Sequence, residues 1–125
     1  MSTVYDAGAL IAAESNNRRI WAEHRARLEI GIEPITTAPV VAQASRSPRQ
    51  AQLRRFLRGC RVVALSPDDA PRVGALLAAN GTADVVDAHL ALIASDARAD
   101  IWTSDPEDLG DLAQHTDHPA AIRRI

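Results

Sequence analysis

Apolar residues follow two alternating patterns along this chain, one typical of strands and one typical of helices. Short apolar runs at residues 3–6, 32–37, 61–65 and 101–104 predict four strands, and residues 121–125 predict a fifth. Between them, apolar residues three and four positions apart predict helices. These cover residues 7–14, a segment from 15–17 to Gly31, one around Pro39, and segments 48–59, 66–79, 82–97 and 106–114.

This order of elements predicts the fold class. Strands that alternate with helices are typical of an α/β fold, here a three-layer α/β/α sandwich with a mainly parallel sheet of four to five strands. The chain has no repeats or linkers and is 125 residues long. We therefore expect one domain covering residues 1–125.

Composition narrows the class of protein further. Aromatic residues make up 3% of the chain, which predicts a core of Val, Leu, Ile and Ala. No apolar run approaches the ~18 residues that a membrane span needs. The N-terminal sequence lacks the features of a secretion signal, and the single Cys60 argues against an internal disulfide and a Cys/His zinc site. We expect a cytoplasmic protein without a membrane partner.

The charges are unevenly distributed, although the net charge is only −2. Residues 46–61 contain six arginines and no acid, whereas residues 84–117 contain nine acids and one arginine. Two interpretations remain open at this point. The segments are either ordinary solvated helices, or an acidic metal pocket beside a basic strip that binds a polyanion.

Acidic residues stand where the predicted strands end. Asp6 and Asp105 each follow a strand, and Asp84 and Asp87 share one face at the start of a helix. Each acid alone can be explained as a helix cap. Because ligands of open α/β sheets bind at the carboxyl ends of the strands, the four acids together favour a site for Mg²⁺ or Mn²⁺.

Four segments carry a resemblance to a known family. They are residues 4–11 (VYDAGALI), 37–42 (TAPVVA), 82–89 (TADVVDAH) and 103–106 (TSDP). In order and spacing they resemble the PIN-domain ribonucleases, specifically the VapC-type toxins of bacterial toxin–antitoxin modules. The resemblance covers essentially the whole chain.

The resemblance implies a function and a set of site residues. It implies an endoribonuclease that uses Mg²⁺ or Mn²⁺ to cleave RNA, is neutralised by a VapB-type antitoxin and forms a homodimer. Asp6, Asp87 and Asp105 would be catalytic, Asp84 would help to bind the metal, and Thr103 or Ser104 would supply a hydroxyl partner. Arg46, Arg49 and Arg54 would contact either RNA phosphates or acidic groups of the antitoxin.

One position departs from the family pattern. A glutamate usually follows the segment that ends here at Ala42, but this chain has Gln43. The amide removes one negative charge and should weaken metal binding. Glu14, two helical turns beyond Asp6, either compensates for this loss or is a solvated helix end.

Two other readings of the sequence remain. The first is a catalytically weak or inactive PIN-like domain that serves as an RNA- or protein-binding module. The second is a receiver-like domain with Asp6 as phosphoacceptor, which the location of Asp84 and Asp87, far along the chain from the first strand, disfavours.

Overall fold

The computed structural model describes residues 2–125, which form five strands and seven helices. The strands are β1 (Thr3–Tyr5), β2 (Ile35–Thr37), β3 (Arg61–Val63), β4 (Asp100–Thr103) and β5 (Ile122–Arg124). The helices are α1 (Ala7–Glu14), α2 (Arg18–Glu29), α3 (Ala38–Ala44), α4 (Ala51–Leu57), α5 (Asp69–Asn80), α6 (Val85–Ala97) and α7 (Pro106–Ala113).

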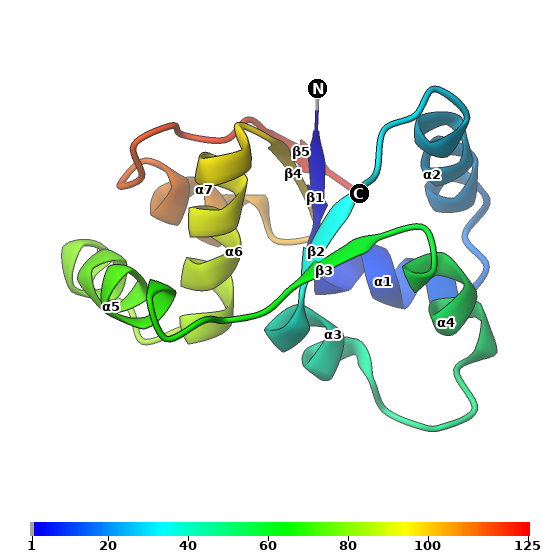
Figure 1. Cartoon of the computed structure of the whole chain (residues 1–125), viewed down its shortest axis with the longest axis horizontal. Helices are drawn as coiled ribbons and strands as arrows, with labels where there is room; N and C mark the ends of the chain where they lie inside the picture. Colours follow the sequence, from blue (N-terminus) through cyan, green and yellow to red (C-terminus); the bar gives the residue numbers. More distant parts are fainter. Residues whose placement is uncertain (1) are drawn as a thin grey trace.

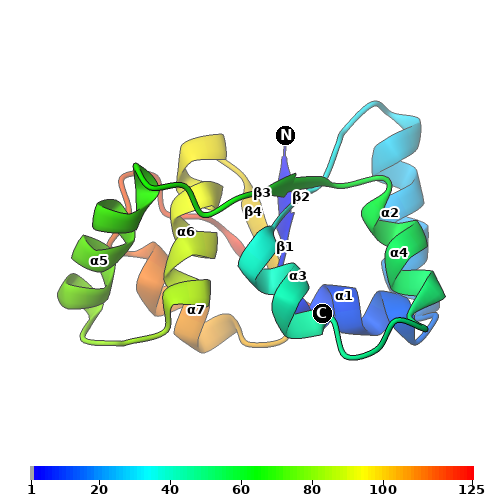
Figure 2. The same cartoon turned by 60° about the horizontal axis from the view of Figure 1, so that its bottom comes forward.

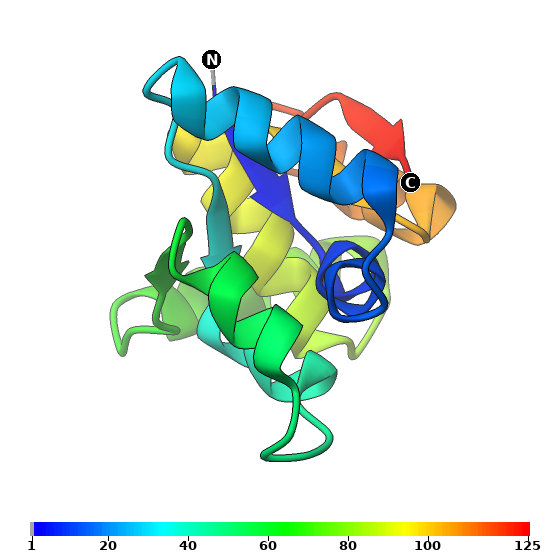
Figure 3. The same ribbon diagram turned by 90° about the vertical axis from the view of Figure 1, so that its right-hand side faces the viewer.

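The elements form the three layers that the sequence predicts. Helices α5, α6 and α7 lie on one side of the sheet, and α1, α2 and α4 lie on the other (Figure 1). Figure 3 shows α2 and α4 in front of the sheet, with α1 at the lower end of β1. Helix α3 lies at the carboxyl ends of the strands, where it contacts α1 and α6 (Figures 1 and 2). The sheet is therefore covered on both faces, as parallel sheets require.

All five strands are parallel, in the order β3-β2-β1-β4-β5. The central strand β1 pairs with β2 through Val4 and Ile35, and with β4 through Val4 and Ile101. The carboxyl ends of β1 and β4 are thus neighbours. Receiver-like folds place the third strand directly beside the first, in the order 2-1-3-4-5, so this order excludes the receiver-like reading.

The core is less aliphatic than the composition suggests. Tyr5, Phe56 and Trp102 are fully buried and Trp21 packs against the same cluster. The ring centres of Tyr5 and Phe56 are 5.1 Å apart, and those of Trp21 and Phe56 are 5.2 Å apart. The expectation of a purely aliphatic core was wrong, because the few aromatic residues gather at one place in it.

Strands β1, β2, β3 and β5 are all shorter than expected, and the reasons are clear for β2 and β3. The run 32–37 becomes a strand only from Ile35, because the Ile32 N–H donates to the Arg27 carbonyl at 2.9 Å in the turn that ends α2. The run 61–65 ends as a strand at Val63, where its partner Thr37 is the last residue of β2. Residue periodicity does not show where a neighbouring strand stops.

Helices α4 and α6 begin later than expected, and α5 begins at Asp69 rather than at residue 66. The segment at Pro48 is a turn, in which Gln50 Oε1 accepts the N–H groups of Arg46 at 2.7 Å and Ser47 at 3.1 Å, so α4 starts at Ala51. Helix α6 is capped by Asp84 rather than by Thr82.

Among residues 2–125, no single helix is long and apolar enough to span a membrane. Only α5 and α6 taken together reach that length, with a bend of 108° between them.

Candidate functional site

Asp6 is fixed at the carboxyl end of β1 by two hydrogen bonds. Its carboxylate is buried, with 7% of the residue exposed. Oδ1 accepts the Ala7 N–H at 2.7 Å and so caps α1. Oδ2 accepts the Thr103 hydroxyl, also at 2.7 Å. The sequence left two roles open for Asp6, namely a helix cap and a member of an acidic site. The structure makes Asp6 a helix cap without excluding it from the site.

Thr103 joins Asp6 to Asp105. Its Oγ1 accepts the Asp105 N–H at 2.9 Å, so its single hydroxyl proton is left to donate to Asp6. Thr103 is fully buried at the end of β4, whereas Ser104 is exposed. Of the two hydroxyls that the resemblance left open, the structure places Thr103 against Asp6.

Asp84 and Asp87 come from the start of α6. Asp84 Oδ1 accepts the Asp87 N–H at 3.0 Å, which makes Asp84 the N-cap. Thr82, the expected cap, instead accepts the Asp84 N–H at 3.4 Å, a weak contact. The helix therefore starts two residues later than predicted, with Asp84 as its cap and Asp87 in its first turn.

The four predicted acids act on one another electrostatically. The pKa of Asp87 is raised to about 7, chiefly because the carboxyl is partly buried. The negative charges of Asp84, Asp6 and Asp105 raise this pKa further. Because four acids that stand on three separate segments influence one proton, the strand ends and the helix start converge on one edge of the sheet.

The acidic group is wider than the four predicted residues. A pocket of about 170 Å³ is lined by Asp84 and Asp87 together with Asp108 and Asp111 of α7. The pKa of Asp108 is raised, first by the charge of Asp105. Sequence reasoning did not single out these two residues, although the spacing of 105, 108 and 111 already placed them on one helix face.

The chemistry of this group suits a hard divalent cation. Carboxylate oxygens are the ligands that Mg²⁺ and Mn²⁺ prefer, and a bound cation would relieve their mutual repulsion. Within residues 2–125, however, no three histidine, cysteine or acidic side chains stand close enough to ligate one ion as they lie. Metal binding here would therefore require some of these side chains to turn.

Glu14 lies outside this group. Its Oε2 accepts the Leu53 N–H at 2.6 Å, in the first turn of α4. The Gln50 side chain, at the N-cap position, makes no capping bond, so Glu14 satisfies this end of α4 from another helix. Glu14 is half-buried and hydrogen-bonded, so the expectation of a solvated helix end was wrong. Its compensation for Gln43 stays a prediction.

Gln43 stands on α3, between α1 and α6. It is half-buried beside Val40 and Ala44, the buried residues of this helix. Its side chain makes no hydrogen bond to any other residue in the range 2–125. The amide is therefore free to be replaced without the loss of an internal contact.

The basic segment begins beyond α3, at the same end of the strands as the acids (Figure 1). Arg46, Arg49 and Arg54 are exposed, and Arg54 donates to the Pro48 carbonyl at 2.6 Å. None of the six arginines in segment 46–61 has a carboxylate partner within 4.0 Å among the described residues.

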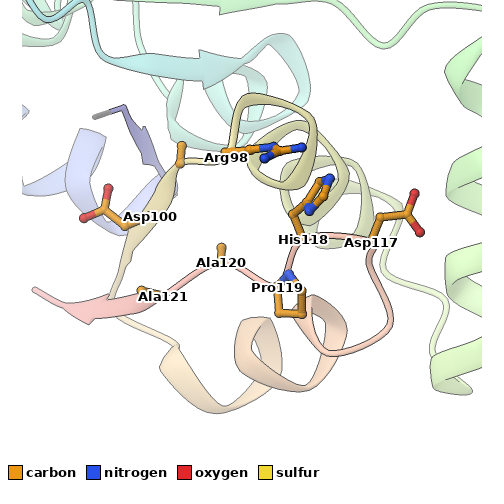
Figure 4. Close-up of a pocket in the computed structure, with 8 residues that line it drawn as sticks. Arg98, Asp100, Asp117, His118, Pro119, Ala120 and Ala121 are labelled. Atoms are coloured by element: carbon orange, nitrogen blue, oxygen red, sulfur yellow. The ribbon is translucent and has the colours of Figure 1, made fainter.

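A larger pocket, of about 460 Å³, lies at the opposite edge of the sheet. It is bounded by the start of β4 and by residues 117–121, and Arg98, Asp100 and His118 are among the residues that line it (Figure 4). It holds none of the predicted site residues.

Two solved structures share this architecture. A chain of VapBC2 from Rickettsia felis, determined with a fragment of its promoter DNA, superimposes with a TM-score of 0.69 at 13% identity and covers 100% of this chain and 99% of its own. PAE2754 from Pyrobaculum aerophilum superimposes with a TM-score of 0.63 at 18% identity, over 98% of this chain and 89% of its own. The protein has a PIN-like fold.

The similarity is one of structure. No family model matches the sequence, and no curated protein matches it either. At 13% and 18% identity the likeness establishes the PIN-like fold that the four sequence segments predicted. The function has to be argued from the residues of the site.

Proposed function

We propose that this protein is a metal-dependent endoribonuclease that hydrolyses phosphodiester bonds in RNA. The observation that carries the proposal is the convergence of Asp6, Asp84, Asp87 and Asp105 at the carboxyl edge of a PIN-like sheet, where partial burial and then the charges of the other three acids raise the pKa of Asp87 to about 7. Asp6, Asp87 and Asp105 are assigned to catalysis, and all four acids to binding Mg²⁺ or Mn²⁺.

The chain's own residues would orient the reacting groups. Asp6 is held by Ala7 and Thr103 and presents a fixed carboxylate. Asp105 is exposed and makes no capping bond, so its side chain can turn toward a ligand. A bound divalent cation supplies positive charge for the phosphate oxygens as negative charge develops on them.

The test compares metal binding with RNA cleavage. We expect millimolar Mn²⁺ to raise the melting temperature of the protein by several degrees, because a cation that binds only the native state stabilises it. A single-stranded RNA should be cleaved with Mn²⁺ and left intact with EDTA. Asp6→Asn should abolish both effects, whereas the matched exposed Asp68→Asn on the α5 side should keep them. If Asp6→Asn shows the same Mn²⁺ response as the wild type, the metal site is assigned wrongly.

We further propose a VapB-type antitoxin as the partner, which would make the protein the toxin of a toxin–antitoxin pair. Support comes from the structural likeness to the VapBC2 chain, over essentially all of both chains. The homodimer implied by the sequence resemblance stays a prediction.

The basic segment is assigned to RNA phosphates, because it extends from the same edge of the fold as the acids and its arginines have no carboxylate partner among the described residues. Arg46→Gln with Arg49→Gln should weaken RNA binding and lower the dependence of log K on log salt by about 0.7 for each lost contact. The control pair Arg18→Gln with Arg25→Gln removes equal charge from the exposed face of α2. An unchanged salt slope together with weaker antitoxin binding would assign the strip to the antitoxin instead.

A variant at Gln43 distinguishes an active enzyme from the alternative, which is a catalytically weak domain that serves as a binding module. Because Gln43 makes no internal hydrogen bond, Gln43→Glu should fold normally and add one anion near the site. We expect tighter Mn²⁺ binding and faster metal-dependent RNA cleavage. Gln52→Glu on α4 is the control for the added charge. A loss of stability without a gain in Mn²⁺ affinity would show that position 43 is structural.

A further inference from the structure

Gly8, in the first turn of α1, touches the segment that connects β4 to α7. A β-carbon at position 8 would lie 2.9 Å from Cβ and 3.2 Å from the backbone nitrogen of Ser104, and closer still to its Oγ. Carbon atoms do not approach one another to 2.9 Å without bonding. The helix and the connection can therefore meet only because residue 8 has no side chain.

The contact falls in the middle of the hydrogen-bonded chain that holds the site. Ser104 is the residue between Thr103, which donates to Asp6, and Asp105, whose N–H donates to Thr103. The Ser104 hydroxyl could rotate away from an added methyl group, but its Cβ and backbone nitrogen could not. A side chain at position 8 would thus push the whole 103–105 segment away from α1.

The other two glycines that lie within helices carry no such requirement. A β-carbon at Gly74, in α5, would meet no atom within 4 Å. One at Gly110, in α7, would meet only Ile122, at an ordinary distance of 3.9 Å. Since glycine weakens a helix relative to alanine, its presence in the first turn of α1 is explained by the approach of Ser104.

We propose that Gly8 is a positioning residue for the acidic site. By letting Ser104 rest on the first turn of α1, it sets the separation of the Asp6 and Asp105 carboxylates. The catalytic meaning of this contact rests on the proposed function. The contact itself involves no metal and can be measured without one.

The experiment enlarges the side chain at position 8 and shortens the side chain at position 104. The variants are Gly8→Ala, Ser104→Gly, and Gly8→Ala combined with Ser104→Ala or with Ser104→Gly. For each we would measure the Mn²⁺ dissociation constant and, in metal-free protein, the hydrogen-exchange rate of the Asp105 amide. Gly8→Ala should weaken Mn²⁺ binding by about tenfold, as loss of supporting contacts around a metal site does. It should also expose the Asp105 amide to faster exchange.

The double variants give the decisive result. Ser104→Ala should restore both readouts in part and Ser104→Gly should restore them further, because the latter removes Cβ as well as Oγ. Gly74→Ala, the control, should leave both unchanged. If Gly8→Ala alone fails to fold but the variant with Ser104→Gly folds and protects the Asp105 amide, the contact is supported.

Two outcomes would overturn the proposal. One is wild-type exchange of the Asp105 amide in Gly8→Ala, and the other is the absence of rescue by Ser104→Gly. If the wild type binds no Mn²⁺, the proposed function fails, while the exchange rates of the same variants still decide the role of Gly8.

Discussion

Replacing Asp87 with asparagine is expected to change stability and activity in opposite directions. The metal-free variant should be more stable than the wild type at pH 7.5, by about 1–2 kcal/mol once the raised pKa of this part-exposed group is discounted for solvent screening. RNA cleavage should fall by on the order of 100-fold or more, because a metal ligand and its charge are lost.

The direction of the expected stability change follows from the protonation of Asp87. The pKa of Asp87 is about 7 in the folded state, against the ordinary aspartate value of 3.8 that applies in the unfolded chain. Between these values the folded protein holds a proton that the unfolded chain releases, so wild-type stability should fall as pH rises from about 4 to 7. Asp87→Asn should remove this part of the slope.

Denaturant unfolding at several pH values, without metal, measures the effect. Asp68→Asn, an exposed aspartate at the start of α5, is the control and should keep the wild-type slope. If Asp87→Asn were less stable than the wild type at pH 7.5, the carboxylate would be serving the fold rather than a ligand.

Replacing Thr103 with valine is expected to destabilise the protein and to disable the site together. Valine has nearly the shape of threonine but leaves two groups without partners, namely Asp6 Oδ2 and the Asp105 N–H. A buried polar group that loses its partner costs about 1–3 kcal/mol, and a charged one more. We expect a loss of about 3 kcal/mol and no stabilisation by Mn²⁺.

Two further variants isolate the hydroxyl. Thr103→Ser keeps it and should retain most of the stability and the Mn²⁺ response. Thr116→Val removes a hydroxyl that donates only to the Ala113 carbonyl, at 2.6 Å, and should cost about 1 kcal/mol. Equal losses of stability in Thr103→Val and Thr116→Val would mean that the hydrogen bond from Thr103 to Asp6 contributes no more than one to a backbone carbonyl.

The sequence predicted the architecture because its patterns are local. Apolar runs and capping residues located every strand and helix in the right order, and Asp6 and Asp105 were placed at neighbouring strand ends. One error arises because an element ends where its partner from elsewhere in the chain ends. Val63 closes β3 because Thr37 closes β2, and no pattern within residues 61–65 contains that information.

The site was predictable as a set of acids but not as a set of contacts. Glu14 caps α4 from 39 residues away, and Thr103 rather than Ser104 reaches Asp6 because of the direction in which β4 presents its last side chain. The wider acidic surface with Asp108 and Asp111 depends on how α7 packs beside α6. These pairings follow from packing between distant segments.

The pairing of β1 with β4 also determines when the site can exist. Asp6 and Thr103 are 97 residues apart in sequence but share one hydrogen bond. A chain that is still being synthesised carries Asp6 from the beginning, yet the Thr103 hydroxyl that holds its Oδ2 is missing until β4 has left the ribosome. A ribonuclease built on this plan would be harmless to the ribosome and the message that produce it until almost the whole chain has been made.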